Sequence, residues 1–391
     1  MARVLGKWSG IFALALIAAL AGASVAGLGL RHLGQAMNGD IGKIVSPNGI
    51  DEAGYMTIGG VRQWVTVRGQ DRSRPVLLFL HGGPGTALAD EAYIFQRPWE
   101  DYFTVVEWDQ RGFGRSDVDA ARIKGTVTND RMVADAIDLI EQLRVRLHQP
   151  KIIVVGQSWG TILGLQVARK RPDLLHALVT IGLSSGWERN FEETRRLLID
   201  LARRTGDRAL LKKMTDAGPA PPATDWQRFS KWGLTVQPEM TNRGYTWHNS
   251  MGPPIVPFIG AGVFSPSLGD GDLLKTFLPH PDRDAYSVQI AGSLSGWTPE
   301  KDVGIRLDVP WVAMQGDWDW QTPTTTARAY FDKVCAPWKL WVPFHNSAHI
   351  VTAEEPGKTV VTLVNDVLPA VTGQIPAGAE TCRGRPGSAY P

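Results

Sequence analysis

Short apolar runs alternate with helical stretches over most of this chain, and that alternation limits the folds it can adopt. A strand buried on one face alternates apolar and polar residues, whereas a strand covered on both faces is apolar almost throughout. Runs of the second kind are RPVLLFL (74–80), YFTVVEWD (102–109), KIIVV (151–155), HALVTIG (176–182), VPWVAMQG (309–316) and KLWVPF (339–344). Together they predict an α/β fold with a mostly parallel, doubly wound sheet and helices on both faces.

The segments around these runs support the same architecture. Residues 55–68 read as a hairpin that turns at two adjacent glycines. Apolar residues recur at helical spacing from Val133 to Leu147, and Thr128 just before them is a residue type that begins helices.

The alternation stops between Ser184 and about Glu300. This stretch begins with a charged helical pattern and then becomes rich in Pro, Gly and Trp, without a strand pattern. We interpret it as a helical cap inserted across the strand ends. The predicted organisation is a leader (1–35), a first core part (36–183), the cap (184–300), a second core part (301–370) and a tail (371–391).

The leader has a basic start followed by an apolar centre. Arg3 and Lys7 precede an apolar run over 8–30, and Ala21 and Ala23 fit a cleavage site of the A-x-A kind. If the run is not cleaved, it is long enough to span a bilayer and would associate the chain with a membrane. Either alternative places the body outside the cytoplasm, in the periplasm or another extracytoplasmic space.

Charge and cysteine content limit the partners and the compartment. The formal net charge is only +2, so the composition does not indicate a nucleic-acid binder. Cys335 and Cys382 are the only cysteines, and in an oxidising compartment they would tie the tail to the body. The spacing is equally compatible with two unpaired thiols.

One segment carries the sharpest chemical signal. In GQSWG (156–160), Ser158 falls where the run from Lys151 gives way to a helical pattern. A strand-to-helix turn this tight crowds side chains, and glycines two residues before and after the serine relieve the crowding. The turn would expose the Ser158 hydroxyl above the sheet as a nucleophile.

A serine nucleophile needs a base and an orienting acid, which should follow later strands in the order Ser, Asp, His. The run ending at Gly316 is followed by Asp317 and Asp319, and the run ending at Phe344 by His345 and His349. Spacing does not choose between the members of each pair. In HGGPG (81–85), the backbone N–H of Gly83 would form an oxyanion hole with that of Trp159.

Five motifs in this order resemble α/β-hydrolases of the proline iminopeptidase type: HGGPG, WDQRGFGRSD, GQSWG, GDWDWQTP and NSAHIVTAEEP. The resemblance implies that Ser158 is the nucleophile, Asp319 the acid and His349 the base. It also implies that the DQRG stretch supports the site structurally. No cofactor and no metal are expected, because no metal-ligand spacing such as HExxH is present.

The resemblance implies release of N-terminal residues, often proline, from small peptides, with cap carboxylates holding the free amine. Glu188, Glu192, Glu193 and Glu239 are the candidates for that role, although a solvated helix face is the expected place for them. A carboxylesterase with a Trp-lined acyl pocket is the alternative, and a non-catalytic binding protein is a more remote one.

Overall fold

The computed structural model describes residues 24–248, 260–277 and 282–382. The contacts between residues divide the chain into two compact units. One contains residues 44–256 and 279–391, and the other contains residues 1–43 and 257–278. The second unit therefore includes part of the stretch that the sequence predicts to be the cap.

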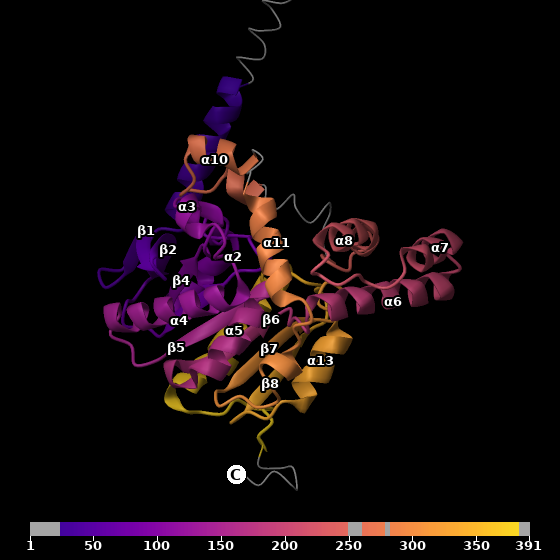
Figure 1. Ribbon diagram of the computed structural model, residues 1–391. Helices are drawn as coiled ribbons and strands as arrows, with labels where there is room; N and C mark the ends of the chain where they lie inside the picture. Colours follow the sequence, from indigo (N-terminus) through magenta and orange to yellow (C-terminus); the bar gives the residue numbers. More distant parts are fainter. Residues whose placement is uncertain (1–23, 249–259, 278–281, 383–391) are drawn as a thin grey trace, which may run out of the picture. The chain divides into compact units, whose positions relative to one another are not determined.

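The larger unit is built on an eight-stranded sheet in the order β1-β2-β4-β3-β5-β6-β7-β8 (Figure 1). The first three strands of that order pair antiparallel, and every later pairing is parallel. The strands are β1 (Ile50–Ile58), β2 (Val61–Gly69), β3 (Val76–Leu80), β4 (Thr104–Trp108), β5 (Ile152–Gln157), β6 (Leu175–Ile181), β7 (Trp311–Gly316) and β8 (Lys339–Phe344). The prediction of a mostly parallel sheet is confirmed.

Burial explains the sequence pattern of the strands. Every residue of β3, β4, β5 and β7 is buried, as the continuous apolar runs predicted. In contrast, β1 lies at the edge and exposes most of its residues.

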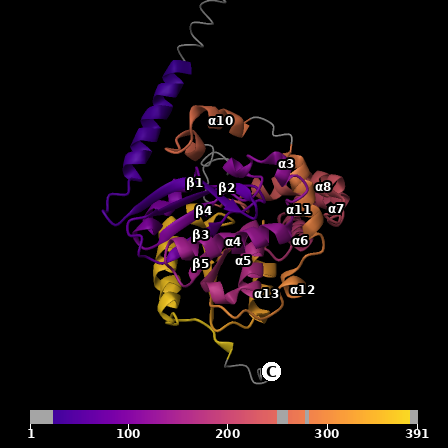
Figure 2. The ribbon, with the colours of Figure 1, turned by 60° about the vertical axis from the view of Figure 1, so that its left-hand side comes forward.

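The helices that cover the sheet begin where the sequence indicates. In α4 (Asn129–Arg146), the Thr128 side chain accepts a hydrogen bond from the Arg131 N–H and so caps the helix. The helix α5 (Trp159–Lys170) follows β5 directly, and Figure 2 shows α4 and α5 side by side across the strands. The other helices of this layer arrangement are α2 (Tyr93–Gln96), α3 (Ala120–Ile123), α13 (Thr324–Lys333), α14 (Val351–Glu354) and α15 (Pro356–Thr362).

Helices replace strands between β6 and β7. In the larger unit these are α6 (Trp187–Thr205), α7 (Arg208–Ala217), α8 (Trp226–Thr241), α11 (Arg283–Leu294) and α12 (Pro299–Asp302) (Figure 2). The first three share an apolar core that includes Leu198, Met214 and Val236. This shared core explains why a segment without strands is nevertheless ordered.

The smaller unit pairs an N-terminal helix over residues 24–41 with the segment that contains α10 (Asp270–Phe277). Arg31 forms an ion pair with Asp270 at 2.9 Å and donates a hydrogen bond to the Leu268 carbonyl. Among the residues that the structure describes, no helix combines the length and apolarity needed to cross a membrane. Most of the predicted leader, residues 1–23, lies outside the described residues.

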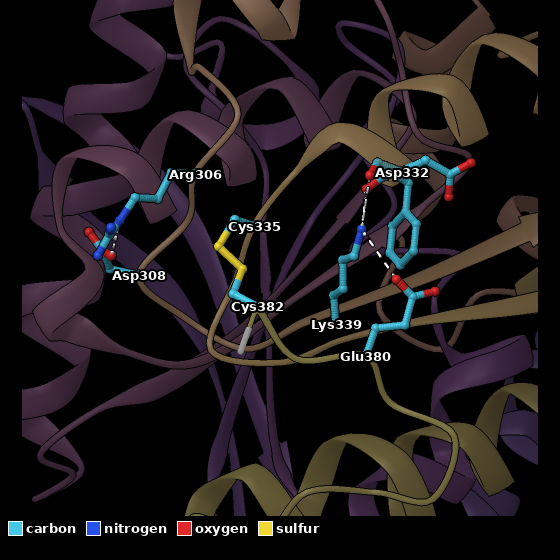
Figure 3. The surroundings of a disulfide bond; sticks show 8 residues. Arg306, Asp308, Asp332, Cys335, Lys339, Glu380 and Cys382 are labelled. Atoms are coloured by element: carbon cyan, nitrogen blue, oxygen red, sulfur yellow. Dashed lines mark hydrogen bonds and ion pairs between the residues drawn. A yellow bond between two sulfur atoms is a disulfide. The ribbon is translucent and has the colours of Figure 1, made fainter. Parts of the chain in front are cut away.

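A disulfide joins Cys335 to Cys382, with Cα atoms 5.5 Å apart (Figure 3). Beside it the tail pairs with β8, where Lys339 and Glu380 exchange backbone hydrogen bonds of 2.9 and 2.8 Å. The Lys339 ammonium also lies 3.5 Å from the Glu380 carboxylate. Of the two alternatives left open by the sequence, the structure has the paired cysteines.

Candidate active site

Ser158 occupies a strained turn between β5 and α5. Its backbone angles, φ of 54° and ψ of −116°, lie in a region that residues other than glycine rarely adopt. A Cβ on Gly156 would lie 2.3 Å from the Gly160 carbonyl oxygen, and one on Gly160 would lie 1.9 Å from that of Leu80. Both positions therefore require glycine, as the GQSWG motif predicted.

The histidine and aspartate loops after β7 and β8 meet in the interior. His349 Nδ1 lies 2.9 Å from Asp319 Oδ2, and the two residues are 6% and 0% exposed. Asp319 also accepts hydrogen bonds from the Gln315 side chain at 3.0 Å and from the Thr322 N–H and hydroxyl at 2.9 and 2.8 Å. These donors fix the position of the Asp319 carboxyl group, which can then hold the His349 Nδ1–H.

The remaining candidates form a second pair at the surface. His345 Nδ1 lies 2.6 Å from Asp317 Oδ2, and their side chains are 67% and 41% exposed. The structure therefore separates the candidates that spacing could not: Asp319 pairs with His349, and Asp317 pairs with His345.

Ser158 and the buried pair approach the same stretch of chain at the end of β6. The Ser158 N–H donates to the Ile181 carbonyl at 2.8 Å. The next residue, Gly182, lies under the His349 ring, because a Cβ there would be 2.9 Å from Cε1. Ser158 and Thr322 also line one cavity, and Thr322 contacts both Asp319 and His349.

The HGGPG loop runs close to the serine. A Cβ on Gly82 would lie 3.2 Å from the Ser158 Cβ, and Gly83, with φ of 115°, lines the cavity together with Trp159. The two residues expected to form an oxyanion hole are thus on the same cavity wall as Ser158.

Gln110 of the DQRG stretch connects this loop to the serine turn. Its side-chain amide donates to the His81 carbonyl at 3.2 Å and accepts from the Trp159 indole N–H at 3.0 Å. Its backbone N–H donates to His81 Nε2, while His81 Nδ1 lies 2.9 Å from the Gly82 carbonyl. Burial lowers the pKa of His81 to about 4, so the neutral ring accepts one bond and donates the other.

The same stretch is anchored to α4 by a buried ion pair. Arg111 Nε lies 2.6 Å from Asp135 Oδ2, and both residues are almost completely buried. Arg111 also donates to the Gly59 carbonyl at 2.9 Å in the β1–β2 turn. These contacts are consistent with a supporting function for DQRG.

The cavity beside Ser158 has a volume of about 360 Å³. Its wall combines loops of the core with side chains from the cap helices α6 and α8. The residues of that wall include Ser184, Trp187, Asn190, Phe191, Trp226, Phe229, Gly233, Gln237 and Gln321.

Sequence reasoning did not single out Gln110, Gln315 or Thr322. All three lie in or beside the quoted motifs, at strand ends, where polar side chains indicate a site. Within the described residues, no group of three or more His, Cys, Asp or Glu side chains is arranged to hold a metal ion.

The sheet order, the serine turn at the end of β5 and the helices between β6 and β7 are features of the α/β-hydrolase fold. Residues 75–242 match the family model described as "alpha/beta hydrolase fold". The chain therefore has the α/β-hydrolase fold, and the similar proteins with assigned activities are hydrolases.

Known proteins similar to this chain include peptidases and esterases. It is 29% identical over 312 residues to "Probable aminopeptidase YbaC" of Bacillus subtilis (strain 168), across 79% of this chain and 93% of that protein. It is 34% identical over 131 residues to the "Proline iminopeptidase" of Neisseria gonorrhoeae, across 34% of this chain and 40% of that protein. The solved structure of a thermophilic esterase from Thermogutta terrifontis matches with a TM-score of 0.51 and 17% identity, covering 82% of this chain and 99% of that one.

Proposed function

We propose that the protein is a serine hydrolase that works through an acyl-enzyme. The observation that carries the proposal is the buried His349–Asp319 pair, which approaches the end of β6 where the Ser158 turn is also held. Ser158, Asp319 and His349 also follow the carboxyl ends of parallel strands of one sheet, as a Ser-Asp-His triad of this fold requires.

In the proposed first step, the Ser158 hydroxyl oxygen bonds to the substrate carbonyl carbon while His349 Nε2 takes the hydroxyl proton. The carbonyl electron pair moves onto its oxygen, where the N–H groups of Gly83 and Trp159 stabilise the negative charge. Asp319 orients the ring and stabilises its positive charge through Nδ1–H.

Collapse of this intermediate breaks the bond to the leaving group, which receives the proton from His349. Water then gives a proton to His349 and attacks the acyl carbon. The Ser158–acyl bond breaks, His349 returns the proton to Ser158, and a carboxylic acid leaves. No cofactor takes part in these proposed reaction steps.

Two substrate classes have support. The names of the relatives favour release of N-terminal residues from small peptides, as by a proline iminopeptidase-like aminopeptidase. The Trp-lined cavity favours carboxylic esters, and an esterase shares the fold. A non-catalytic binding protein would not need the buried His349–Asp319 pair.

We also propose that the protein acts outside the cytoplasm, exported or attached to a membrane through residues 8–30. The Cys335–Cys382 disulfide supports this location, because disulfides persist in oxidising compartments.

The test is covalent labelling with a fluorophosphonate, followed by mass spectrometry of the modified peptide. We expect the adduct on Ser158, and we expect Ser158→Ala to lose both the adduct and about 10³-fold or more of p-nitrophenyl acetate hydrolysis. The control is Ser73→Ala, which removes an exposed serine that does not line the cavity. Unchanged activity of Ser158→Ala would overturn the proposal.

A further inference from the structure

The described residues that line the cavity beside Ser158 include no ionisable side chain. The residues that line it in the described part of the chain carry aromatic rings, amides, hydroxyls or aliphatic groups, and none is Asp, Glu, Lys, Arg or His. The undescribed internal segments 249–259 and 278–281 contain no Asp or Glu in their sequence. A substrate ammonium bound in this cavity would lose water without gaining a carboxylate, which is strongly unfavourable.

The carboxylates of the cap have other partners. Glu188 accepts hydrogen bonds from the Ala223 N–H at 3.0 Å and the Ser295 hydroxyl at 3.2 Å. The other three pair with basic side chains: Glu192 with Arg195 at 2.5 Å, Glu193 with Arg196 at 2.6 Å, and Glu239 with Lys213 at 2.6 Å. None of the four lines the cavity. The structure therefore does not support the hypothesis that they hold the free amine of a substrate.

Aromatic rings from α6 and α8 line the cavity on the cap side, together with amide, hydroxyl and aliphatic groups. Trp187 and Phe229 are nearly parallel, with centroids 6.2 Å apart, and Phe191 meets the Phe229 ring edge-on at 5.4 Å. Rings that pack on one another in this way give a stable apolar surface. Such a surface matches an apolar acyl group.

Gly233 leaves space in this wall. It lies in the interior of α8, where glycine is less favourable than alanine by about 1 kcal/mol. Gly233 is buried, yet a Cβ added to it would meet no atom within 4 Å. The missing side chain therefore opens room in the cavity, and a larger residue could occupy that room without striking the protein.

We propose that this cavity takes a bulky, uncharged acyl group and discriminates against an acyl group with a free ammonium, and that Gly233 sets the room available. This inference rests on the proposed serine hydrolysis and names the substrate class for the same site: carboxylic esters, or amides without a free amine next to the carbonyl.

The test for charge uses two p-nitrophenyl esters of similar size, 3-phenylpropionate and L-phenylalanine, at pH 6.5 with subtraction of uncatalysed hydrolysis. They differ in the ammonium group, and we expect kcat/KM to be about tenfold or more higher for phenylpropionate. Equal or faster hydrolysis of the phenylalanine ester would overturn the inference.

Hydrolysis of p-nitrophenyl acetate distinguishes failure of this inference from failure of the proposed function. If acetate hydrolysis depends on Ser158 but the aminoacyl ester is preferred, only the present inference fails. If neither hydrolysis nor labelling depends on Ser158, the proposed function fails and this inference fails with it.

The test for size uses Gly233→Leu, with Gly233→Ala as the smaller step. We expect Gly233→Leu to lower the ratio of kcat/KM for phenylpropionate over acetate by about tenfold, with Gly233→Ala in between, since bulk added to an acyl pocket opposes the larger group. The matched control is Gly292→Leu in α11. Gly292 is also a helical glycine with no atom within 4 Å of an added Cβ, but it is exposed and does not line the cavity. The control should keep the wild-type ratio.

An unchanged ratio in Gly233→Ala and in a folded Gly233→Leu, as judged by circular dichroism, would overturn the assignment of Gly233. A shift of the same size in Gly292→Leu would do so as well, because it would show a general effect on the cap.

Discussion

At the scale of single residues, burial distinguishes two histidine–aspartate pairs of similar geometry. The Asp317–His345 pair is exposed to water, which screens the interaction and competes for its hydrogen bonds. Asp319 is fully buried and receives three further hydrogen bonds, so it holds His349 in one orientation. In the proposed mechanism, proton transfer is therefore assigned to the second pair.

A matched set of substitutions tests this distinction. We expect Asp319→Asn to lower kcat by about 10³- to 10⁴-fold, because the amide would stabilise the wrong tautomer of His349. The equivalent change at the surface, Asp317→Asn, should leave kcat within about twofold, as expected for an exposed pair. Steady-state hydrolysis of p-nitrophenyl acetate measures both, and comparable losses in the two variants would contradict the assignment.

A group of interacting carboxyls consists of Glu91, Glu107 and Asp109, of which the last two are almost completely buried. Burial, reinforced by Asp90, raises the pKa of Glu91 to about 8. Burial also raises the pKa of Asp109 to about 7, and it raises that of Glu107, beside Asp109, well above its usual value. Arg115 is the opposing charge, and it lowers the pKa of both Glu91 and Asp109. Folding therefore favours the protonated form of this group.

The sign of the pH dependence follows from proton binding. The Glu91 carboxyl has a pKa near 4.5 when unfolded and about 8 when folded, so between these values the folded state binds more protons. The free energy of unfolding should therefore fall as pH rises from about 5 to 8. In Glu91→Gln this fall should be smaller, as measured by urea unfolding at several pH values. Identical slopes in the two proteins would show that Glu91 does not titrate in this way.

At the scale of elements, the serine turn depends on how closely α5 approaches β3. Gly160 is the contact point, because any side chain there would overlap the Leu80 carbonyl oxygen. The helix must approach this far for its first N–H groups to face the cavity beside Ser158. Small residues at the turn are thus a condition for the backbone geometry of Ser158, the proposed nucleophile.

Gly160→Ala should consequently destabilise the protein by about 2 kcal/mol or more, through forced displacement of the backbone. It should also lower kcat, because α5 carries Trp159 away from the HGGPG loop. Gly292→Ala serves as the control, since it adds a methyl group to an exposed helix with open space around it. That control should be neutral or stabilise by up to about 1 kcal/mol. Urea unfolding measures both variants. An equal free energy of unfolding for Gly160→Ala and Gly292→Ala would contradict the importance of the close contact.

At the scale of the whole molecule, the disulfide fixes the C-terminal tail to the core sheet. It closes a loop spanning 47 residues that contains β8 and the His349 loop. In the chain-entropy account, a cross-link over a loop of this length stabilises the folded state by about 4 kcal/mol, because it restricts the unfolded chain.

We therefore expect the double variant Cys335→Ser, Cys382→Ser to unfold at a lower temperature than the oxidised protein, by several degrees. Reduction of the wild type should give a similar shift, because both treatments remove the same cross-link. Differential scanning calorimetry measures the change. A melting temperature that is the same with and without reductant would contradict a stabilising role.

The sequence by itself determined the features that depend on neighbours along the chain. Apolar runs such as RPVLLFL fixed the buried strands, because both faces of a parallel strand must be apolar. The GQSWG motif fixed the serine turn, since only glycine fits where α5 approaches β3. The Thr128 cap and the helix that follows it were likewise evident from local pattern alone.

Only the tertiary structure decided the features that depend on distances between remote residues. Asp317 and Asp319 are two positions apart in sequence, yet one faces water and the other the interior. The pairing of Cys335 with Cys382, the ion pair between Lys213 and Glu239 and the open space at Gly233 could not be predicted from local pattern. Each of them depends on how segments remote in sequence pack against one another. The distances between such segments are set only when the whole chain has folded.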